Sequence, residues 1–359
     1  MATAARQAAR QAIEAPCAWH GRALAARDDW IWRLSVAELG ELDAALQGAR
    51  RQDIAWPEIT RESFPLPRLA ARLAALADEL ENGRGLVLLR GLPVEDYEAD
   101  DRKRLFMGLA AHVGRAVTQS VKGELMAEIR DEGAGVGAAR GQMATGMPGE
   151  TFLSSRARVH TTGALRYHTD RTDVVTLLCV RPAKAGGVSN IVSSVAIHNA
   201  MLERRPDLLE LLFGDYPRSR FGEESKDPSR VYHLPVFALE DGRFTSHYSR
   251  TYIEAAQLIP GVPRLGDAQI EALDLLHALA EELSYAMTFQ AGDMQFLNSH
   301  VTYHARAPYE DHDEPARKRL LYRLWLAMPN SRPLPANHAV LWGATAAGAL
   351  RGGIRASLP

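Results

Sequence analysis

The sequence contains little cysteine, no strong excess of charge of either sign and no long apolar run. Its 359 residues include 2 cysteines, and 42 basic residues nearly balance 44 acidic ones. A net charge of −2 creates no field that would attract nucleic acid or anionic lipid. No apolar run approaches the length of a membrane-spanning helix. We therefore expect no nucleic-acid partner and no membrane partner.

The two cysteines, Cys17 and Cys179, lie far apart in the chain. Cys179 belongs to the apolar run 174–180, which favours a buried free thiol over a disulfide. Free thiols are typical of a reducing compartment, so we expect a cytoplasmic protein.

The order of helical and strand-like segments predicts an α+β protein. Residues 1–82 have apolar residues at helical spacing, and Ser35 and Glu38 form a capping-box pattern, so we expect a helical N-terminal extension packed on the core. From 83 to 335, short strand-like runs alternate irregularly with helices. Without a βαβ rhythm, they favour a double-stranded β-helix, the jelly-roll or cupin-like fold, braced by helices. Residues 336–359 would form a C-terminal tail.

Three local signals refine this outline. The apolar run Gly85–Pro93 predicts a buried strand, and Pro206 should break the helix expected over 195–213. The glycine-rich stretch 131–163 has no periodicity and leads directly into a histidine, His168. Two interpretations of that stretch stay open, a lid over a site and an ordinary surface loop.

The short segment Leu165–Asp170 carries a candidate metal site. In an extended stretch, side chains two positions apart point to the same face, so His168 and Asp170 can reach one ion. Nitrogen and carboxylate ligands suit Fe(II), and two His with one carboxylate leave coordination positions open. A His-x-Asp pair also occurs by chance at polar strand edges, so a further ligand is needed elsewhere in the chain.

The C-terminal third supplies that ligand. Residues 298–306 read NSHVTYHAR, and the basic and apolar run 317–326 follows. Together with the His-x-Asp pair, these segments resemble the iron- and 2-oxoglutarate-dependent dioxygenases of the taurine dioxygenase (TauD/TfdA) and clavaminate synthase-like family. The resemblance extends from about residue 83 to residue 335, and the order of its motifs is more specific than any one of them.

The resemblance implies an enzyme that uses Fe(II), 2-oxoglutarate and O2. Such enzymes hydroxylate an unactivated C–H bond of a small molecule while 2-oxoglutarate is decarboxylated to succinate and CO2. Halogenating relatives replace the ligand carboxylate by a small residue, so the presence of Asp170 favours hydroxylation. Desaturation, epoxidation or cyclisation by the same chemistry stays open, as does the identity of the substrate. A non-catalytic metal-binding jelly-roll module and a zinc hydrolase are the alternatives from other classes.

Two histidines, His300 and His304, compete for the third ligand position, because they face the same way on a strand. The family has an Asn ahead of the ligand and an Arg two positions after it. Asn298 and Arg306 fit that pattern around His304. The resemblance therefore assigns the metal to His168, Asp170 and His304.

Arg319 matches the family arginine that holds the distal carboxylate of 2-oxoglutarate, and its planar guanidinium suits that role. Ser189 matches a hydroxyl that supports the same carboxylate. The spacing from His304 to Arg319 is longer than in taurine dioxygenase, so Arg317 competes with Arg319. Arg319 and Ser189 are both expected to hold a dicarboxylate cosubstrate. A module without oxygen chemistry would not need one, so these residues disfavour that alternative.

Arg323, four positions after Arg319, has the spacing of the arginine that binds the acidic group of the substrate in taurine dioxygenase. Gln119 occupies a region where relatives place polar groups that face the substrate or cosubstrate, although a polar turn would also explain it. The partner implied by the resemblance is a small-molecule substrate. A homo-oligomer is an open alternative to a monomer.

Overall fold

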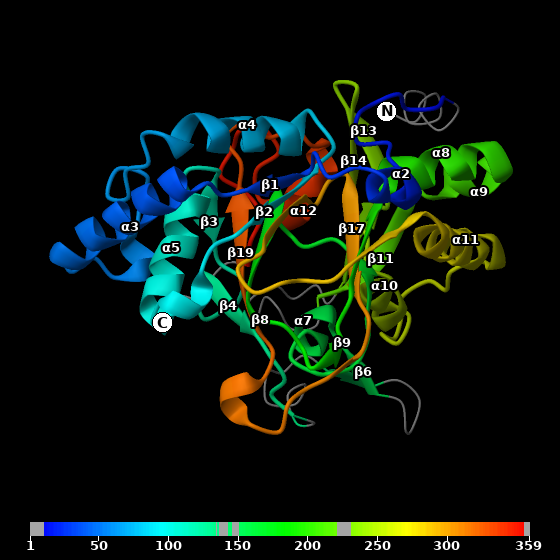
Figure 1. The fold of residues 1–359 in the computed structure, drawn as a ribbon. Coiled ribbons are helices and arrows are strands. Elements are labelled where there is room, and N and C mark those ends of the chain that lie inside the picture. The colour runs from blue at the N-terminus through cyan, green and yellow to red at the C-terminus, as the bar shows by residue number, and fades with distance from the viewer. Residues whose placement is uncertain (1–10, 134, 136–142, 146–150, 221–230, 355–359) are drawn as a thin grey trace.

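The computed structural model describes residues 11–133, 135, 143–145, 151–220 and 231–354. Two sheets form its centre, and every strand pair except β1–β2 is antiparallel (Figure 1). The larger sheet contains β1 (Ile31–Arg33), β2 (Leu86–Arg90), β16 (Met294–Asn298), β8 (Val174–Arg181), β19 (Leu320–Ala327) and β3 (Arg115–Val117) in that order, with β4 (Met126–Ile129) also on β19. The smaller sheet contains β15 (Tyr285–Met287), β10 (Ser189–Ser193), β17 (Thr302–Arg306) and β7 (Leu165–His168) in that order.

Helices cover the outer side of each sheet (Figure 1). On the larger sheet lie α3 (Val36–Arg51), α4 (Leu69–Glu81) and α5 (Ala99–Ala111). On the smaller sheet lie α8 (Ser194–Arg204), α9 (Pro206–Leu211) and α11 (Asp267–Leu283). No helix among the described residues is long and apolar enough to cross a membrane.

Short helices and hairpins complete the fold. The helical turns are α2 (Gly21–Ala25), η1 (Trp56–Glu58), η2 (Val94–Asp96), α7 (Ser155–Arg158), α10 (Arg250–Ala256), η3 (Pro315–Arg317), η4 (Ala336–His338) and α12 (Ala339–Trp342). The two-stranded pairs are β5 (Met143–Thr145) with β6 (Thr151–Leu153), β9 (Ala185–Gly186) with β18 (Tyr309–Glu310), β11 (Asp215–Ser219) with β12 (Val231–Pro235), and β13 (Phe237–Glu240) with β14 (Arg243–Ser246).

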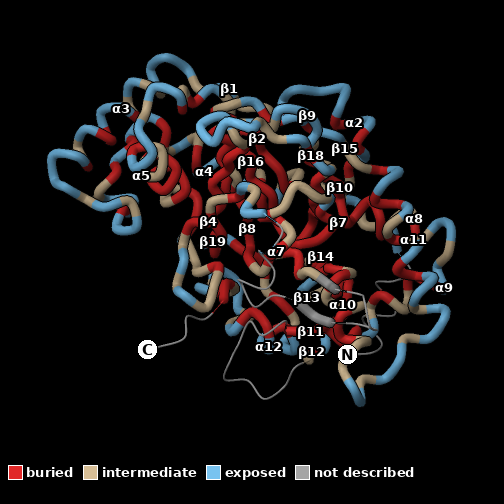
Figure 2. The backbone as a smooth tube through the Cα atoms, turned by 90° about the horizontal axis from the view of Figure 1, so that it is seen from below, coloured by how far each residue is buried: buried red, intermediate tan, exposed pale blue. Residues whose placement is uncertain are grey.

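The interior contains three large apolar clusters and one small one among the described residues, and Figure 2 shows the buried centre of the chain. Strand β8 illustrates how the sequence builds them: Val174 and Leu178 face the helices, whereas Val175 and Cys179 face the space between the sheets. A strand covered on both faces reads as a continuous apolar run, which explains the run seen in the sequence. Cys179 is a buried free thiol, as predicted, and burial raises its pKa to about 12.

Several local predictions are confirmed. Ser35 and Glu38 form the capping box at the start of α3, with the Ser35 N–H donating to Glu38 Oε2 over 2.7 Å. Strand β2 occupies the predicted run after Gly85, and Pro206 separates α8 from α9. One feature of the N-terminal extension differs from the expectation of helices alone. Residues Ile31–Arg33 form β1, parallel to β2, and three residues are too few to give a strand signal in a sequence.

Candidate metal centre and active site

Two neighbouring strands of the smaller sheet bring the candidate histidines together. Strand β7 ends at His168, and in the ladder with β17 the Cα partner of His168 is His304. The register shifts between His304 and Arg306, which marks an irregularity directly after the histidine. Asp170 lies in the bend that follows β7, so all three side chains reach the same end of the sheet.

The ligand atoms of His168, Asp170 and His304 all lie within 4.8 Å of one another. The Nε2 atoms of His168 and His304 are 3.9 and 3.8 Å from the Asp170 carboxylate oxygens Oδ1 and Oδ2, respectively. The imidazole ring centroids are 4.2 Å apart, and all three side chains are buried. This arrangement could hold one metal ion between two nitrogens and one oxygen.

The chemistry of these groups fits Fe(II). In the tautomer with the proton on Nδ1, His168 donates to the Arg166 carbonyl over 2.9 Å and leaves Nε2 for a metal. Burial lowers the pKa of His168, and it lowers the pKa of His304 to about 3, so both rings are neutral near pH 7. Burial opposes the charge of Asp170, but neighbouring groups, with the Arg323 guanidinium first among them, outweigh burial and lower the Asp170 pKa. Two neutral imidazoles and one carboxylate match the ligand set of non-haem iron.

The structure places His300, the alternative ligand, elsewhere. Its Nε2 lies 2.8 Å from Asp173 Oδ1 and its Nδ1 lies 2.8 Å from Thr245 Oγ1, so both ring nitrogens are occupied. The residue is fully buried and its ring stacks on Trp342. His300 therefore belongs to a separate hydrogen-bonded cluster, and His304 is the histidine that faces His168 and Asp170.

A cavity on one side of these ligands contains both residues assigned to 2-oxoglutarate, Arg319 and Ser189. Ser189 is buried, and its hydroxyl accepts a 3.5 Å contact from Gln295 Nε2. The remaining lining is mostly apolar and includes Ile129, Val159, Leu165, Leu177, Phe289 and Leu321. Arg306 and Arg323 are its other charged residues, and Arg323 also lines the second cavity described below. We call this space the cosubstrate cavity.

Arg319 is buried beside the ring of Tyr309, with its guanidinium carbon 5.0 Å from the ring centroid. Among the described residues its Nη1 has no hydrogen-bond partner, and a buried cation of this kind requires an anion. Arg317 has a different place: it lies in η3, its side chain is 61% exposed, and it contacts Glu314. Both arginines precede β19, which begins at Leu320, but only Arg319 is buried and lines the cavity.

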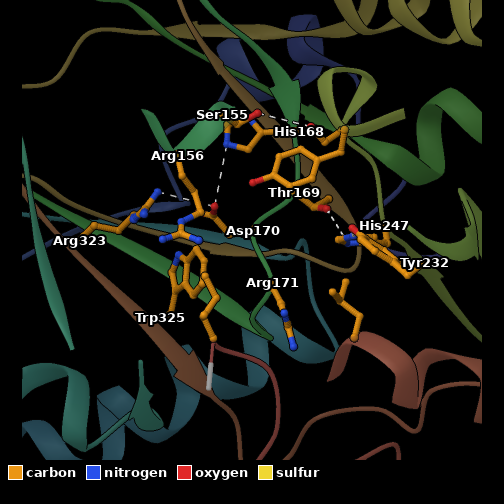
Figure 3. Close-up of a pocket in the computed structure, with 14 residues that line it drawn as sticks. Ser155, Arg156, His168, Thr169, Asp170, Arg171, Tyr232, His247, Arg323 and Trp325 are labelled. Atoms are coloured by element: carbon orange, nitrogen blue, oxygen red, sulfur yellow. Dashed lines mark hydrogen bonds and ion pairs between the residues drawn. The ribbon is translucent and has the colours of Figure 1, made fainter. Parts of the chain in front are cut away.

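A second cavity lies on the other side of Asp170, and we call it the substrate cavity. Figure 3 shows Arg156 and Arg323 pointing toward Asp170 within it, whereas Arg171 points away. Arg323 Nη1 is 3.6 Å from Asp170 Oδ1. The rest of the lining comes from several segments: Ser155, His168, Thr169, Tyr232, His247, Ser249, Tyr252, Trp325, Leu341 and Ile354.

Gln119 orients Arg323 and lines neither cavity. Its Oε1 accepts from Arg323 Nε over 2.7 Å, and its Nε2 donates to the carbonyls of Arg323 and Leu125. The side chain is buried and contacts the arginine, and the expected contact between Gln119 and a ligand stays a prediction. The sequence places Gln119 in a region where relatives have polar groups that face the ligand. It does not show which neighbouring residue the Gln119 side chain contacts.

Sequence reasoning missed most of the substrate cavity. Arg156, Tyr232 and His247 come from segments without a local motif, and only the fold brings them together. Thr169, Arg171 and Trp325 had a signal, because they lie within or directly beside the motifs that contain Asp170 and Arg323. In addition, Arg306 donates hydrogen bonds to the carbonyls of residues 159, 161 and 163, and so fixes the backbone that leads to β7.

The predicted lid, 131–163, is described in part: residues 134, 136–142 and 146–150 of this stretch lie outside the described residues. Its last section forms α7 and supplies Ser155 and Arg156 to the substrate cavity. The lid interpretation stays a prediction.

Comparison with known proteins agrees with this geometry. Residues 50–325 match the family described as taurine catabolism dioxygenase TauD, TfdA family. The chain belongs to the TauD/TfdA family. Among curated relatives, FR-33289 synthase of Streptomyces rubellomurinus is 28% identical, with 92% of this chain and 94% of that protein covered. The taurine hydroxylase-like protein SAT17 of Stachybotrys chartarum is 30% identical, with 86% of this chain and 77% of that protein covered.

Solved structures share the fold of this TauD/TfdA protein. Asparagine oxygenase, in complex with Fe(II), hydroxyasparagine and succinate, has a TM-score of 0.62 and 13% identity, with 83% of this chain and 93% of that chain covered. The non-haem iron oxygenase OrfP, in complex with Fe and α-ketoglutaric acid, has a TM-score of 0.59 and 16% identity, with coverages of 82% and 93%. The predicted family and the jelly-roll fold are thereby confirmed. The cluster of His168, Asp170 and His304 could hold a metal ion, and the solved relatives bind iron with α-ketoglutaric acid or succinate.

Proposed function

We propose that this dioxygenase hydroxylates an unactivated C–H bond of a small molecule that carries an acidic group. His168, Asp170 and His304 would hold Fe(II), and Arg319 with Ser189 would hold 2-oxoglutarate. Bound iron and cosubstrate supply the oxidation, in which O2 is consumed and succinate and CO2 are released. The observation that carries the proposal is the convergence of three buried ligand groups between two cavities, each containing a buried arginine.

Two features of the cosubstrate cavity support the assignment of Arg319. Its buried guanidinium can make two parallel hydrogen bonds to the far carboxylate of 2-oxoglutarate. The apolar lining around it strengthens that charge-assisted contact, because little water competes. The Ser189 hydroxyl lies in the same cavity and can donate a further hydrogen bond to that carboxylate.

The charge of the substrate cavity supports an acidic substrate. Arg156, Arg171 and Arg323 line it, and its one carboxylate belongs to Asp170, whose charge a metal ion would share. Burial lowers the pKa of Arg323; Asp170 counteracts this effect, while Arg156 adds to it. An acid group placed between Arg156 and Arg323 would therefore offset charges that otherwise repel each other. Gln119 would serve to hold Arg323 in position.

Solved relatives suggest a first panel of substrates. Asparagine oxygenase binds hydroxyasparagine, OrfP binds hydroxyarginine, and the family description names taurine. Each parent molecule carries an acid group, so each can be compared with a neutral analogue in which that group is an amide.

The test measures succinate and oxidised product with Fe(II), 2-oxoglutarate and O2 for each acid and its neutral analogue. We expect at least one acid to stimulate succinate formation and to gain one oxygen atom by mass, while its amide does neither. The His304→Ala variant should be inactive throughout. Stimulation by the neutral analogues alone would contradict the acidic-substrate proposal, and succinate formation that survives in His304→Ala would contradict the site.

A further inference from the structure

The C-terminal segment 336–354 is built into the active-site half of the molecule. Leu341 and Ile354 line the substrate cavity, and both are buried. The Ile354 N–H donates to the Thr118 carbonyl over 2.8 Å, which holds this part of the segment next to β3. The segment that the sequence suggested was a tail thus forms one wall of the cavity.

A buried carboxylate in the bend after β7 joins this segment to the rest of the site. Asp173 Oδ1 accepts hydrogen bonds from Arg351 Nε and from His300 Nε2, each over 2.8 Å. Its Oδ2 accepts from the Met328 N–H, and its backbone carbonyl accepts from the Ser299 N–H, each over 2.9 Å. One residue therefore fastens together the bend after β7, the turn between β16 and β17, the end of β19 and the C-terminal segment.

Two of these four segments carry the metal ligands. Asp173 lies three residues after Asp170, and His300 lies four residues before His304. A shift of Asp173 relative to His300 would therefore change the separation of Asp170 and His304. Arg351 opposes such a shift, because its Nη2 also donates to the Arg332 carbonyl over 2.7 Å and its side chain is fully buried.

Charge explains why an arginine is needed at this point. Burial disfavours the charge of Asp173, but the His300 hydrogen bond and the Arg351 charge outweigh burial and lower the Asp173 pKa. Burial also lowers the pKa of His300, so the ring is neutral and Arg351 is the cation in contact with Asp173. Without it, a buried carboxylate would lose its charge partner and the surrounding segments would rearrange.

The glycines after Arg351 make a second contact with the bend after β7, which contains the ligand Asp170. The Gly353 N–H donates to the Arg171 carbonyl over 2.8 Å, directly after Asp170. Gly352 has a φ of +75°, and a Cβ atom added there would lie 2.8 Å from the same carbonyl oxygen. A side chain at Gly352 would therefore push on the residue that follows the ligand.

We infer that the C-terminal segment 336–354 supports the metal centre, with Arg351 as a positioning residue that fixes the separation of the two ligand-bearing segments. This inference rests on the proposed metal site at His168, Asp170 and His304. Groups that orient metal ligands from outside the first shell typically change metal affinity by about 10–100-fold when removed.

The chain offers matched controls for the test. Arg351→Gln is compared with Arg90→Gln, which breaks another Arg–Asp pair. Arg90 is partly buried and lies 2.7 Å from the buried Asp293, at the far end of β16 from the ligand turn. Gly352→Ala is compared with Gly348→Ala, which has a φ of +68° and would place Cβ 2.6 Å from the Pro329 carbonyl oxygen instead. In each pair, both variants lose the same kind of interaction or gain the same kind of backbone strain. Only the first variant of each pair alters a contact with the bend after β7.

The dissociation constant of Mn(II), an iron surrogate, is measured on the full chain from the free-Mn(II) signal in electron paramagnetic resonance. The temperature is kept below each variant's unfolding transition. Arg351→Gln and Gly352→Ala should weaken Mn(II) binding by about tenfold or more, while Arg90→Gln and Gly348→Ala change it by less than about twofold. Arg351→Lys, which keeps the charge, should recover part of the affinity.

Equal affinity in both members of each pair would overturn the inference, even if all variants are less stable than the wild type. Should Arg351→Gln not fold, Arg351→Lys and the glycine pair decide by the same criterion. If the wild type does not bind Mn(II), or if His304→Ala binds it as tightly, the proposed metal site is wrong and the inference falls with it. Wild-type binding that is lost in His304→Ala but unaltered in the Arg351 and Gly352 variants contradicts the inference alone.

Discussion

The two cavities beside the ligand cluster differ in how the chain builds them. The cosubstrate cavity is lined mostly by apolar residues, and among the described residues the Nη1 atom of its Arg319 has no hydrogen-bond partner. The substrate cavity is lined mostly by polar and charged residues, which come from α7, the bend after β7, the β12 and β14 region, β19 and the C-terminal segment. A cavity for one fixed dicarboxylate needs a few residues on adjoining strands, whereas a cavity for a particular substrate can draw on segments from the whole chain.

The ligands between the cavities give the largest expected effect. His304→Ala should weaken Mn(II) or Fe(II) binding by more than about 100-fold, because a direct ligand exceeds the effect of outer residues. Calorimetric titration of the metal measures it. His300→Ala should retain a measurable site with reduced affinity, since His300 acts through Asp173. The assignment of the third ligand is wrong if His300→Ala empties the site and His304→Ala does not.

Arg319→Ala should give the next largest effect, and this effect should be confined to the binding of 2-oxoglutarate. Loss of a buried charge-assisted carboxylate contact costs about 2–5 kcal/mol, so the apparent constant for 2-oxoglutarate should rise by about 30-fold or more. Initial rates at varied 2-oxoglutarate measure it. Arg317→Ala is the control, because its side chain is 61% exposed and should leave the constant unchanged. A rise in Arg317→Ala with none in Arg319→Ala would contradict the assignment.

Arg323→Gln should affect the substrate side. A hydrogen bond to a charged group is worth about 1.5–3 kcal/mol, so binding of an acidic substrate should weaken by about tenfold or more while metal affinity is retained. Substrate titration of the Mn(II)–2-oxoglutarate complex provides the measurement. Arg130→Gln, at an exposed arginine outside both cavities, is the control. An unchanged substrate constant would remove Arg323 from the substrate site.

Ser189→Ala should have the smallest effect. One hydroxyl hydrogen bond contributes about 0.5–1.5 kcal/mol, so the 2-oxoglutarate constant should rise by about two- to tenfold. Rates at varied 2-oxoglutarate again suffice. Ser193→Ala on the same strand is no substitute as a control, because Ser193 caps α8; Ser189→Thr, which keeps the hydroxyl, is the better comparison. An effect as large as that of Arg319→Ala would mean that Ser189 has a further role.

The same contrast shows how far the sequence alone could predict the site. His168, Asp170, His304, Arg319 and Arg323 lie on or directly beside β7, β17 and β19, and their type and spacing were sufficient to predict them as one site. Arg156 and His247 carry no motif, and their place depends on how a short helix and a hairpin pack over the ligands. The role of Arg351 was hidden for the same reason, since Asp173 is 178 residues away in the chain.

The fold divides in a similar way. Apolar residues at helical spacing predicted α3 and α4, because that spacing places them on one buried face of each helix; a capping box also marked the start of α3. Strand β1 was missed, because three residues cannot display a period and the pairing with β2 decides their conformation. Gln119 was predicted as a polar residue of the site. Its hydrogen bond to Arg323 joins residues 204 positions apart, and the sequence does not reveal such a pair.

We propose that the metal centre lies between two cavities, with Arg319 holding the cosubstrate and Arg323 holding the substrate. The most direct measurement is the binding of 2-oxoglutarate to the Mn(II)-loaded protein, by calorimetry, in the wild type, Arg319→Ala and Arg323→Ala. We expect tight binding in the wild type, a loss of about 30-fold or more in Arg319→Ala, and a change of less than about threefold in Arg323→Ala. Loss of 2-oxoglutarate binding in Arg323→Ala with retention in Arg319→Ala would contradict the account.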